Sequence, residues 1–233
     1  MTAARTYLDY NASAPLRAEA RAAMVAAIDT LGNPSSVHAE GRAARAIIEH
    51  AREEVAKLVN AHASEVVFTS GATEANNWVM AGSWDEICVS SIEHDSVLAP
   101  ARASGARLSS LPVSTIGVVD VEAAKSILAR ASERSQRVLV SLMLANNETG
   151  VMQPAAEVAA EARRLGATMH IDAVQAPGRI RVDFAALGAD AMVLSAHKLG
   201  GPRGAGALIL RDGVTLPPLI RGGGQERRRR GGT

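Results

Sequence analysis

Residues 193–202 read Val-Leu-Ser-Ala-His-Lys-Leu-Gly-Gly-Pro, and this stretch indicates how the chain folds. Its first residues are typical of a short apolar β-strand, which ends in a hydroxyl, an imidazole and an amine before a glycine turn. The amine of Lys198 can form a Schiff base with an aldehyde cofactor, and Ser195 and His197 can bind a phosphate. A lone lysine is more often a solvated surface group, so this stretch alone leaves both interpretations open.

A second apolar strand ends upstream at Asp172, and Gln175 follows it. A carboxylate in this place could keep the ring nitrogen of pyridoxal 5'-phosphate (PLP) protonated, and the Gln175 amide could donate a hydrogen bond to the phenolic oxygen of the ring. The simpler alternative is an acid that caps a turn or a helix. An acid at one strand end and Lys198 at a later one together favour PLP as the cofactor.

Short apolar runs alternate with alanine-rich helical patterns along the chain. Near-continuous apolar strands between helices predict an α/β protein with a mostly parallel sheet covered on both faces. Ligands of such sheets lie beyond the carboxyl ends of the strands, so Asp172 and Lys198 are expected to converge there. Pro154 suits the first turn of a helix and Gly166 its C-terminal cap. The expected strands are 65–69, 86–89, 107–111, 137–142, 168–172, 191–195 and 206–210, and the expected helices are 17–30, 41–60, 73–80, 121–132 and 154–165.

The sequence Thr-Ser-Gly-Ala-Thr-Glu at residues 69–74 follows one of these strands and opens a helix. A glycine turn at a helix N-terminus offers free backbone N–H groups and the positive end of the helix dipole to a phosphate. An ordinary helix capped by Ser70 or Thr73 is the alternative. The stretch is therefore a candidate phosphate site that needs support from elsewhere in the chain.

His94 and Asn147 each follow an expected strand. His94 could stack on the cofactor ring and transfer protons, or it could be a hydrogen-bonded loop histidine. Asn147 could donate its amide to the ring oxygen, or it could belong to a turn that ends at Gly150. Neither residue decides between these alternatives by itself.

The composition limits the class of protein. The chain has 233 residues, of which 47% are hydrophobic and 3% aromatic, so we expect a large aliphatic core. The formal net charge of +1 argues against a general nucleic-acid binder, and the arginine run 227–230 contains no aromatic residue for base stacking. The longest apolar stretch, 138–145, is too short to span a membrane, and no secretory signal is visible. We therefore expect a cytoplasmic protein that binds neither nucleic acid nor membrane.

These pieces, in this order, resemble the cysteine desulfurases (NifS/IscS-like), a branch of the class V aminotransferases. The resemblance implies a fold-type-I PLP enzyme whose large domain holds a mostly parallel, seven-stranded sheet with helices on both faces. It covers essentially the whole chain, and the joint order of the motifs is highly specific. The matching stretches are 7–15, 32–38, 68–77, 93–94, 146–150, 172–175, 195–198 and 222–233.

The resemblance also implies roles for individual residues. Lys198 would hold PLP covalently and, with His94, would move protons. Asp172 would pair with the ring nitrogen, Gln175 and Asn147 would contact the phenolic oxygen, and His94 would stack on the ring. The residues implied for the phosphate are Ala72, Thr73, Ser195 and His197, with Thr233 reaching the phosphate of the other subunit. The active unit would therefore be a homodimer with shared sites.

The implied reaction converts L-cysteine to L-alanine and leaves the sulfur as a persulfide on an enzyme thiolate. That sulfur would pass to a sulfur-acceptor or scaffold protein for iron–sulfur cluster or thio-cofactor assembly. Cys88 lies in an apolar run and is expected to be a buried small hydrophobic residue, so it cannot be the nucleophile. In the family, the nucleophilic cysteine and an arginine that binds the substrate carboxylate come after the point where this chain ends.

The resemblance therefore predicts a chain that lacks part of the enzyme. Residues 1–15 would be the N-terminal segment of a small domain, residues 16–233 would be the large PLP-binding domain, and the C-terminal part of the small domain would be absent. Two alternatives remain. One is another class V PLP enzyme, such as a selenocysteine lyase. The other is a non-catalytic scaffold that dimerises or binds a sulfur-acceptor protein.

Overall fold

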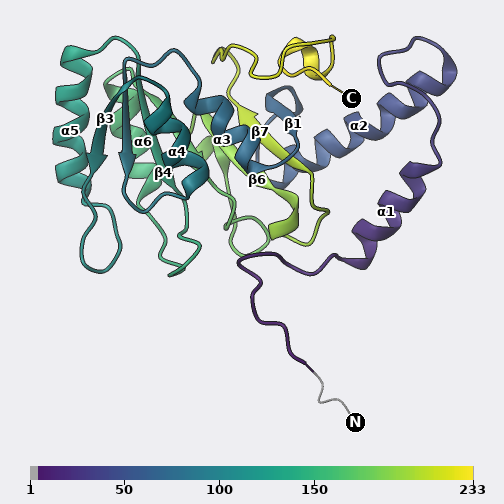
Figure 1. Ribbon diagram of the computed structural model, residues 1–233, viewed down its shortest axis with the longest axis horizontal. Coiled ribbons are helices and arrows are strands. Elements are labelled where there is room, and N and C mark those ends of the chain that lie inside the picture. Colours follow the sequence, from purple (N-terminus) through teal and green to yellow (C-terminus); the bar gives the residue numbers. More distant parts are fainter. Residues whose placement is uncertain (1–4, 233) are drawn as a thin grey trace.

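The computed structural model describes residues 5–232 and contains a seven-stranded sheet flanked by helices (Figure 1). The strands lie in the order β1-β7-β6-β5-β4-β2-β3. They are β1 (Val66–Thr69), β2 (Glu86–Ser90), β3 (Arg107–Leu111), β4 (Val138–Met143), β5 (Thr168–Asp172), β6 (Ala191–Ser195) and β7 (Gly206–Leu210). The helices are α1 (Ala18–Ile28), α2 (Ala39–Leu58), α3 (Ala72–Met80), α4 (Asp95–Ala103), α5 (Val121–Arg134), α6 (Ala155–Arg164) and α7 (Phe184–Leu187).

The sheet is mostly parallel, as the alternation of strands and helices predicted. The pairs β2–β3, β2–β4, β4–β5 and β5–β6 are parallel, while β7 runs antiparallel to both β1 and β6. Because β4, β5 and β6 are parallel, they end at the same edge of the sheet. Asp172 is the last residue of β5 and Ser195 the last of β6, so tertiary structure brings the two strand ends side by side.

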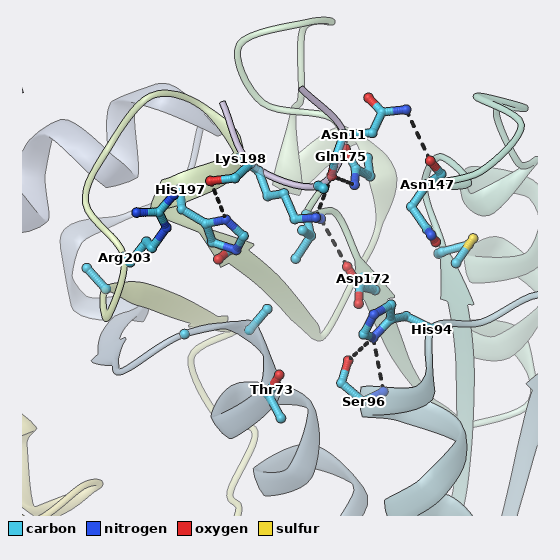
Figure 2. A pocket seen from close by; sticks show the side chains of 18 of the residues that line it. Asn11, Thr73, His94, Ser96, Asn147, Asp172, Gln175, His197, Lys198 and Arg203 are labelled. Atoms are coloured by element: carbon cyan, nitrogen blue, oxygen red, sulfur yellow. Dashed lines mark hydrogen bonds between the residues drawn. The ribbon is translucent and has the colours of Figure 1, made fainter. Parts of the chain in front are cut away.

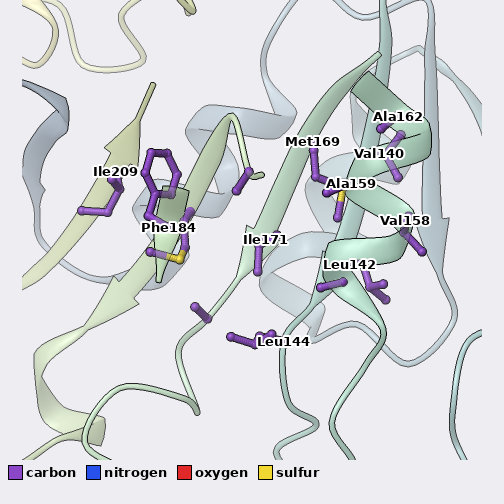
Figure 3. Packing of buried hydrophobic residues seen from close by; sticks show 14 of the residues in the cluster. Val140, Leu142, Leu144, Val158, Ala159, Ala162, Met169, Ile171, Phe184 and Ile209 are labelled. Carbon is purple, nitrogen blue, oxygen red and sulfur yellow. The ribbon is translucent and has the colours of Figure 1, made fainter. Parts of the chain in front are cut away.

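The core has two layers, one on each face of the sheet. Helices α5, α6 and α7 cover one face, and Leu128 of α5 belongs to the buried cluster there. In the same cluster, Val158 and Phe184 lie with strand residues such as Leu142 and Ile171 (Figure 3). Helices α3 and α4 cover the other face. Many contacts come from alanine, whose short side chain lets a helix approach the sheet closely. Side chains alternate along β5, so Met169 and Ile171 face the α5–α6 layer. Asp172 consequently faces the opposite layer, which contains α3.

The strand predictions agree with the structure to within one residue at each end, but two helices were missed. Pro100 lies inside α4 and obscured its helical pattern, because proline lacks the N–H that a helix needs. Helix α7 has 4 residues, too few to show a helical period. The prediction that Pro154 occupies the first turn of α6 was wrong, since Pro154 is the N-cap residue. Gly166 follows the helix in the left-handed conformation, with φ of 72°, as expected of a C-terminal glycine.

Helix α1 lies at the end of the molecule opposite α5, and none of its residues is buried (Figure 1). Ile28 is 77% exposed and the following Leu31 is 80% exposed. The structure does not test the division into a small-domain segment 1–15 and a large domain 16–233, which stays a prediction. No described helix combines the length and apolar character needed to cross a membrane.

Candidate functional site

A cavity of about 740 Å³ opens beyond the carboxyl ends of β4, β5 and β6 (Figure 2). The structure brings together in its wall all the site residues predicted from the sequence except Thr233, which lies outside the described residues. Their roles toward a cofactor remain predictions. The predicted residues that line the cavity are Ala72, Thr73, His94, Asn147, Asp172, Gln175, Ser195, His197 and Lys198.

One wall of the cavity is the N-terminus of α3. Its N-cap residue is Gly71, and no side chain caps the helix, so the alternative in which Ser70 or Thr73 caps it was wrong. Ser70 instead donates from its N–H (2.8 Å) and its hydroxyl (2.6 Å) to the carboxylate of Glu74. The first N–H groups of the helix therefore have no side-chain cap, and the positive end of the helix dipole faces the cavity.

The turn that precedes α3 lies against the end of β7. A Cβ atom built on Gly206 would lie 2.7 Å from the Cα atom of Gly71, so this approach requires glycine at position 206. Gly206 pairs with Ser195 in the sheet. The uncapped helix end and the Ser195 hydroxyl therefore lie at the same corner of the cavity, as a phosphate site built from both would require.

A second wall carries the acid. Asp172 is 7% exposed, and its carboxylate accepts hydrogen bonds from the Asn76 amide (2.8 Å) and from the backbone N–H of Val174 (3.0 Å). Burial raises the pKa of Asp172, and these hydrogen bonds offset part of that rise. Such a carboxylate would be stabilised by a positively charged partner in the cavity.

His94 is oriented by the same group of residues. Its Nδ1 atom accepts from the backbone N–H of Ser96 (3.0 Å) and lies 2.9 Å from the Ser96 hydroxyl, which also accepts from the Asn76 amide (2.9 Å). Because a backbone N–H can only donate, Nδ1 is the acceptor and the neutral ring carries its proton on Nε2. Asn76 thus links the Asp172 carboxylate to the His94 imidazole.

Lys198 projects into the cavity from the short 3₁₀ turn that follows β6, and its ammonium donates to the backbone carbonyl of Asn11 (Figure 2). Burial lowers the pKa of Lys198, the nearby Arg179 lowers it further, and Asp172 opposes both. A lowered pKa raises the fraction of free amine, which is the nucleophilic form. The side-chain amide of Gln175 donates to the same Asn11 carbonyl, at 2.9 Å.

The remaining predicted residues lie on the rim of the cavity. The Nδ1 atom of His197 lies 3.4 Å from the Ser13 hydroxyl, and burial lowers the pKa of this imidazole. The Asn147 amide donates to the carboxylate of Glu148 at 2.6 Å, so in this structure its donor is engaged within its own loop. That loop is also the turn considered as the alternative, since Asn146 accepts the N–H of Gly150 at 2.9 Å.

Reasoning from sequence missed several residues of the site, among them Asn11, Asn76, Ser96 and Arg203. Asn76 is fully buried on the inner side of α3, and an amide at an inward position of a helix is the signal that could have identified it. Asn11 acts through its backbone carbonyl, which leaves no trace in the side-chain pattern. Cys88 is fully buried, as expected, and burial raises the pKa of its thiol to about 12.

The described residues fit PLP. An uncapped helix N-terminus suits its phosphate, the buried Asp172 carboxylate suits its ring nitrogen, and the Lys198 amine suits its aldehyde. The cavity has the volume expected of a cofactor site. Among the described residues, no cluster of histidine, cysteine and acidic side chains is arranged to hold a metal ion.

Comparison with known proteins agrees with this geometry. The chain is 42% identical to "Cysteine desulfurase IscS" of Dictyoglomus turgidum, over 97% of this chain and 59% of that protein. It is also 42% identical to "IscS-like cysteine desulfurase" of Mycobacterium tuberculosis, over 97% of this chain and 61% of that protein. These relatives confirm the resemblance, and the chain spans about 60% of their length.

Solved structures give the same result. A structure described as "NIFS-LIKE PROTEIN" superimposes with a TM-score of 0.93 and 36% identity, covering 99% of this chain and 65% of that chain. The NifS-like protein from Rickettsia africae gives a TM-score of 0.90 and 36% identity, covering 97% and 64%. The family model "Aminotransferase class-V" matches residues 6–230. This chain therefore belongs to the class V aminotransferase family.

Proposed function

We propose that this chain is the PLP-binding part of a cysteine desulfurase, which releases sulfur from L-cysteine and leaves L-alanine. The names of its relatives support this proposal. It is also supported by a solved structure described as "SspA in complex with cysteine", with a TM-score of 0.89, 34% identity and coverage of 98% of this chain. Because the chain spans about 60% of the length of its relatives, activity of residues 1–233 alone is part of the proposal.

One observation carries the proposal: the Lys198 amine and the Asp172 carboxylate converge from two parallel strand ends on one cavity. The two groups are close enough for Asp172 to raise the pKa of Lys198. A surface lysine would not face a buried carboxylate, an imidazole and a helix N-terminus at once. The arrangement is therefore suited to an aldehyde cofactor with a phosphate and a basic ring nitrogen.

PLP, when bound, supplies an electron sink for the bond that breaks at the α-carbon of an amino acid. Asp172 would hold a proton on the ring nitrogen, and Ala72, Thr73, Ser195 and His197 would hold the phosphate. Lys198 would hold the cofactor and then act as the amine that takes and returns a proton. The His94 ring, with its proton on Nε2, would donate from the cavity side, since its Nδ1 is engaged by Ser96.

The sulfur step needs a thiolate, which this chain does not place at the site. Cys88 is the one cysteine of the sequence, and it is fully buried in β2 with a raised pKa. We propose that the accepting thiolate lies outside residues 1–233. The sulfur would then pass from it to a sulfur-acceptor protein for iron–sulfur or thio-cofactor assembly. A homodimer in which Thr233 reaches the partner's phosphate is part of the same proposal.

The visible absorption spectrum of the purified chain with added PLP tests the proposal. We expect a band of protein-bound PLP that changes when L-cysteine is added and does not change with an equal concentration of L-lactate, which has no amino group. A band that responds to L-selenocysteine and not to L-cysteine would favour a selenocysteine lyase. A folded protein without any band would contradict the proposal and favour the scaffold alternative.

A further inference from the structure

Arg179 lies just outside the cavity and is bound to one of its lining residues. Its guanidinium donates to the side-chain oxygen of Gln175 at 2.7 Å and to the backbone carbonyl of Gln175 at 2.9 Å. A further N–H of the same guanidinium donates to the backbone carbonyl of Tyr10 at 3.1 Å. One side chain therefore holds Gln175 and also the segment that carries Asn11.

These contacts determine which way the Gln175 amide points. A guanidinium has only donors, so the atom that faces Arg179 must be the oxygen Oε1. The Nε2 group then faces the other way, where it donates to the backbone carbonyl of Asn11 at 2.9 Å. That carbonyl has no donor, so the two partners specify the same orientation of the amide.

The amide has one donor left for the cavity. Nε2 carries two hydrogens, and in the described part of the chain one hydrogen bond uses one of them. Gln175 is 9% exposed and lines the cavity beside Lys198. If Arg179 were absent, the Oε1 atom of Gln175 would lose the donor that specifies its orientation. The Gln175 side chain would then no longer be held in this orientation and could move or rotate.

We propose that Arg179 is a positioning residue that fixes the Gln175 amide with its N–H donor toward the phenolic oxygen of bound PLP. This inference rests on the proposed function, because it assumes that PLP occupies the cavity. A donor at the phenolic oxygen withdraws electron density from the cofactor. It should therefore lower the pKa of the nitrogen through which Lys198 holds PLP. Arg179 would therefore act on the cofactor indirectly, through the Gln175 amide.

A spectrophotometric pH titration of the PLP-bound protein tests the proposal. We expect Arg179→Met to move the midpoint of the titration of the visible band about one pH unit upward. A shift of this size corresponds to the loss of one hydrogen bond to a charged group. Arg179→Lys keeps a donor and should return most of the shift. Arg181→Met is the matched control, since Arg181 is 90% exposed and lies 4.0 Å from Asp183. An unchanged midpoint in Arg179→Met would overturn the proposal.

A double-mutant cycle separates positioning from the charge of Arg179 itself. The same titration is made with Gln175→Leu and with Gln175→Leu combined with Arg179→Met. If Arg179 acts through the amide, the second substitution adds no further shift once Gln175 is gone. A full shift in the Gln175→Leu background would show a direct charge effect and would refute the positioning role. The other charges that act on Lys198, namely Asp9, Glu148 and Asp172, are unchanged throughout.

The amide can also be observed without cofactor, which separates this inference from the proposed function. The chain has four glutamines, so ¹⁵N-glutamine labelling gives few side-chain signals, and Gln175→Leu assigns the one of interest. We expect Arg179→Met to move that signal and to speed its hydrogen exchange, while Arg181→Met leaves it unchanged. A protein that binds no PLP but shows this change would refute the proposed function alone. An unmoved signal would refute the role of Arg179.

Discussion

The side-chain amide of Asn76 lies 2.8 Å from the carboxylate of Asp172 and 2.9 Å from the hydroxyl of Ser96, which contacts the His94 ring. Asn76 is fully buried in α3, whereas Asp172 ends β5. The helix whose N-terminus faces the cavity therefore also orients the acid and, through Ser96, the histidine. A substitution at this one position should affect both walls of the site.

We expect Asn76→Ala to weaken PLP binding about tenfold, because Asp172 loses a hydrogen bond to its charged form and its pKa rises further. Equilibrium titration with PLP, followed by the visible band, measures this loss. Asn77→Ala is the control, since the Asn77 amide donates to the backbone carbonyl of Thr73 within the same helix. Equal affinities in Asn76→Ala and the unsubstituted protein would show that Asn76 has no influence on the site.

Lys198→Ala should abolish the visible band of covalently held PLP. The reason is that Lys198 is the lysine that lines the cavity in the described part of the chain, so no other amine is positioned to replace it. The spectrum of the variant with added PLP, recorded after removal of free cofactor, makes the measurement. Lys57→Ala, at the exposed end of α2, is the matched control. An unchanged band in Lys198→Ala would show that a different amine holds the cofactor.

Cys88→Ala should leave PLP binding intact and destabilise the fold by about 1 kcal/mol, as expected for a small change in a packed interior. Cys88 is fully buried in β2, and its thiol, with a pKa of about 12, is neutral at physiological pH. The PLP titration and denaturant unfolding of the same samples measure the two quantities. Loss of the band with the fold retained would mean that β2 contributes to the site in a way that the structure does not show.

Glu93 should make the protein less stable as the pH rises. Its carboxyl group is 5% exposed, and it accepts hydrogen bonds from the Ser90 hydroxyl and the Met143 N–H, each at 2.7 Å. Burial raises its pKa from 4.5 to about 8. Between these values the folded state binds a proton that the unfolded state has released. The free energy of unfolding should therefore fall by up to about 1 kcal/mol per pH unit across this window.

The contribution of Glu93 is measured between pH 6.5 and pH 8 by comparing the unsubstituted protein with a variant at this position. Burial lowers the pKa of His170 from 6.5 to about 3. This has the opposite effect: between these values the unfolded state binds a proton that the folded state does not, so the free energy of unfolding rises with pH. As the pH rises above 6.5 that effect fades, because the unfolded imidazole then loses its proton as well, whereas the effect of Glu93 persists up to its folded pKa of about 8. Glu93→Gln should flatten the dependence of the unfolding free energy on pH in this interval, whereas Glu53→Gln on the exposed face of α2 should not. A slope that persists in Glu93→Gln would assign it to another group.

Part of this protein could be predicted from local sequence alone. Most of the β-strands are short apolar runs, and burial of such runs follows from the free energy of removing apolar surface from water. The edge strand β3 is the exception, because three of its five residues are polar and only Leu111 is buried. The polar residues Asp172 and Ser195 end two of these runs, and parallel strands bring their carboxyl ends to one edge. The mostly parallel sheet and the convergence of Asp172 with Lys198 therefore follow from neighbouring residues and general rules of topology.

The contacts that orient these groups depend on residues far apart in the chain. Asn76 and Asp172 are separated by 96 positions, and Gln175 and Asn11 by 164. A local pattern shows that an amide is buried but not which partner it meets, because the partner is set by how α3 and the N-terminal segment pack against the sheet. The strands and strand-end residues were thus specified locally. The direction of each amide, the proton position on His94 and the role of Arg179 were decided by tertiary packing, since a donor is oriented only by the acceptor that packing places beside it.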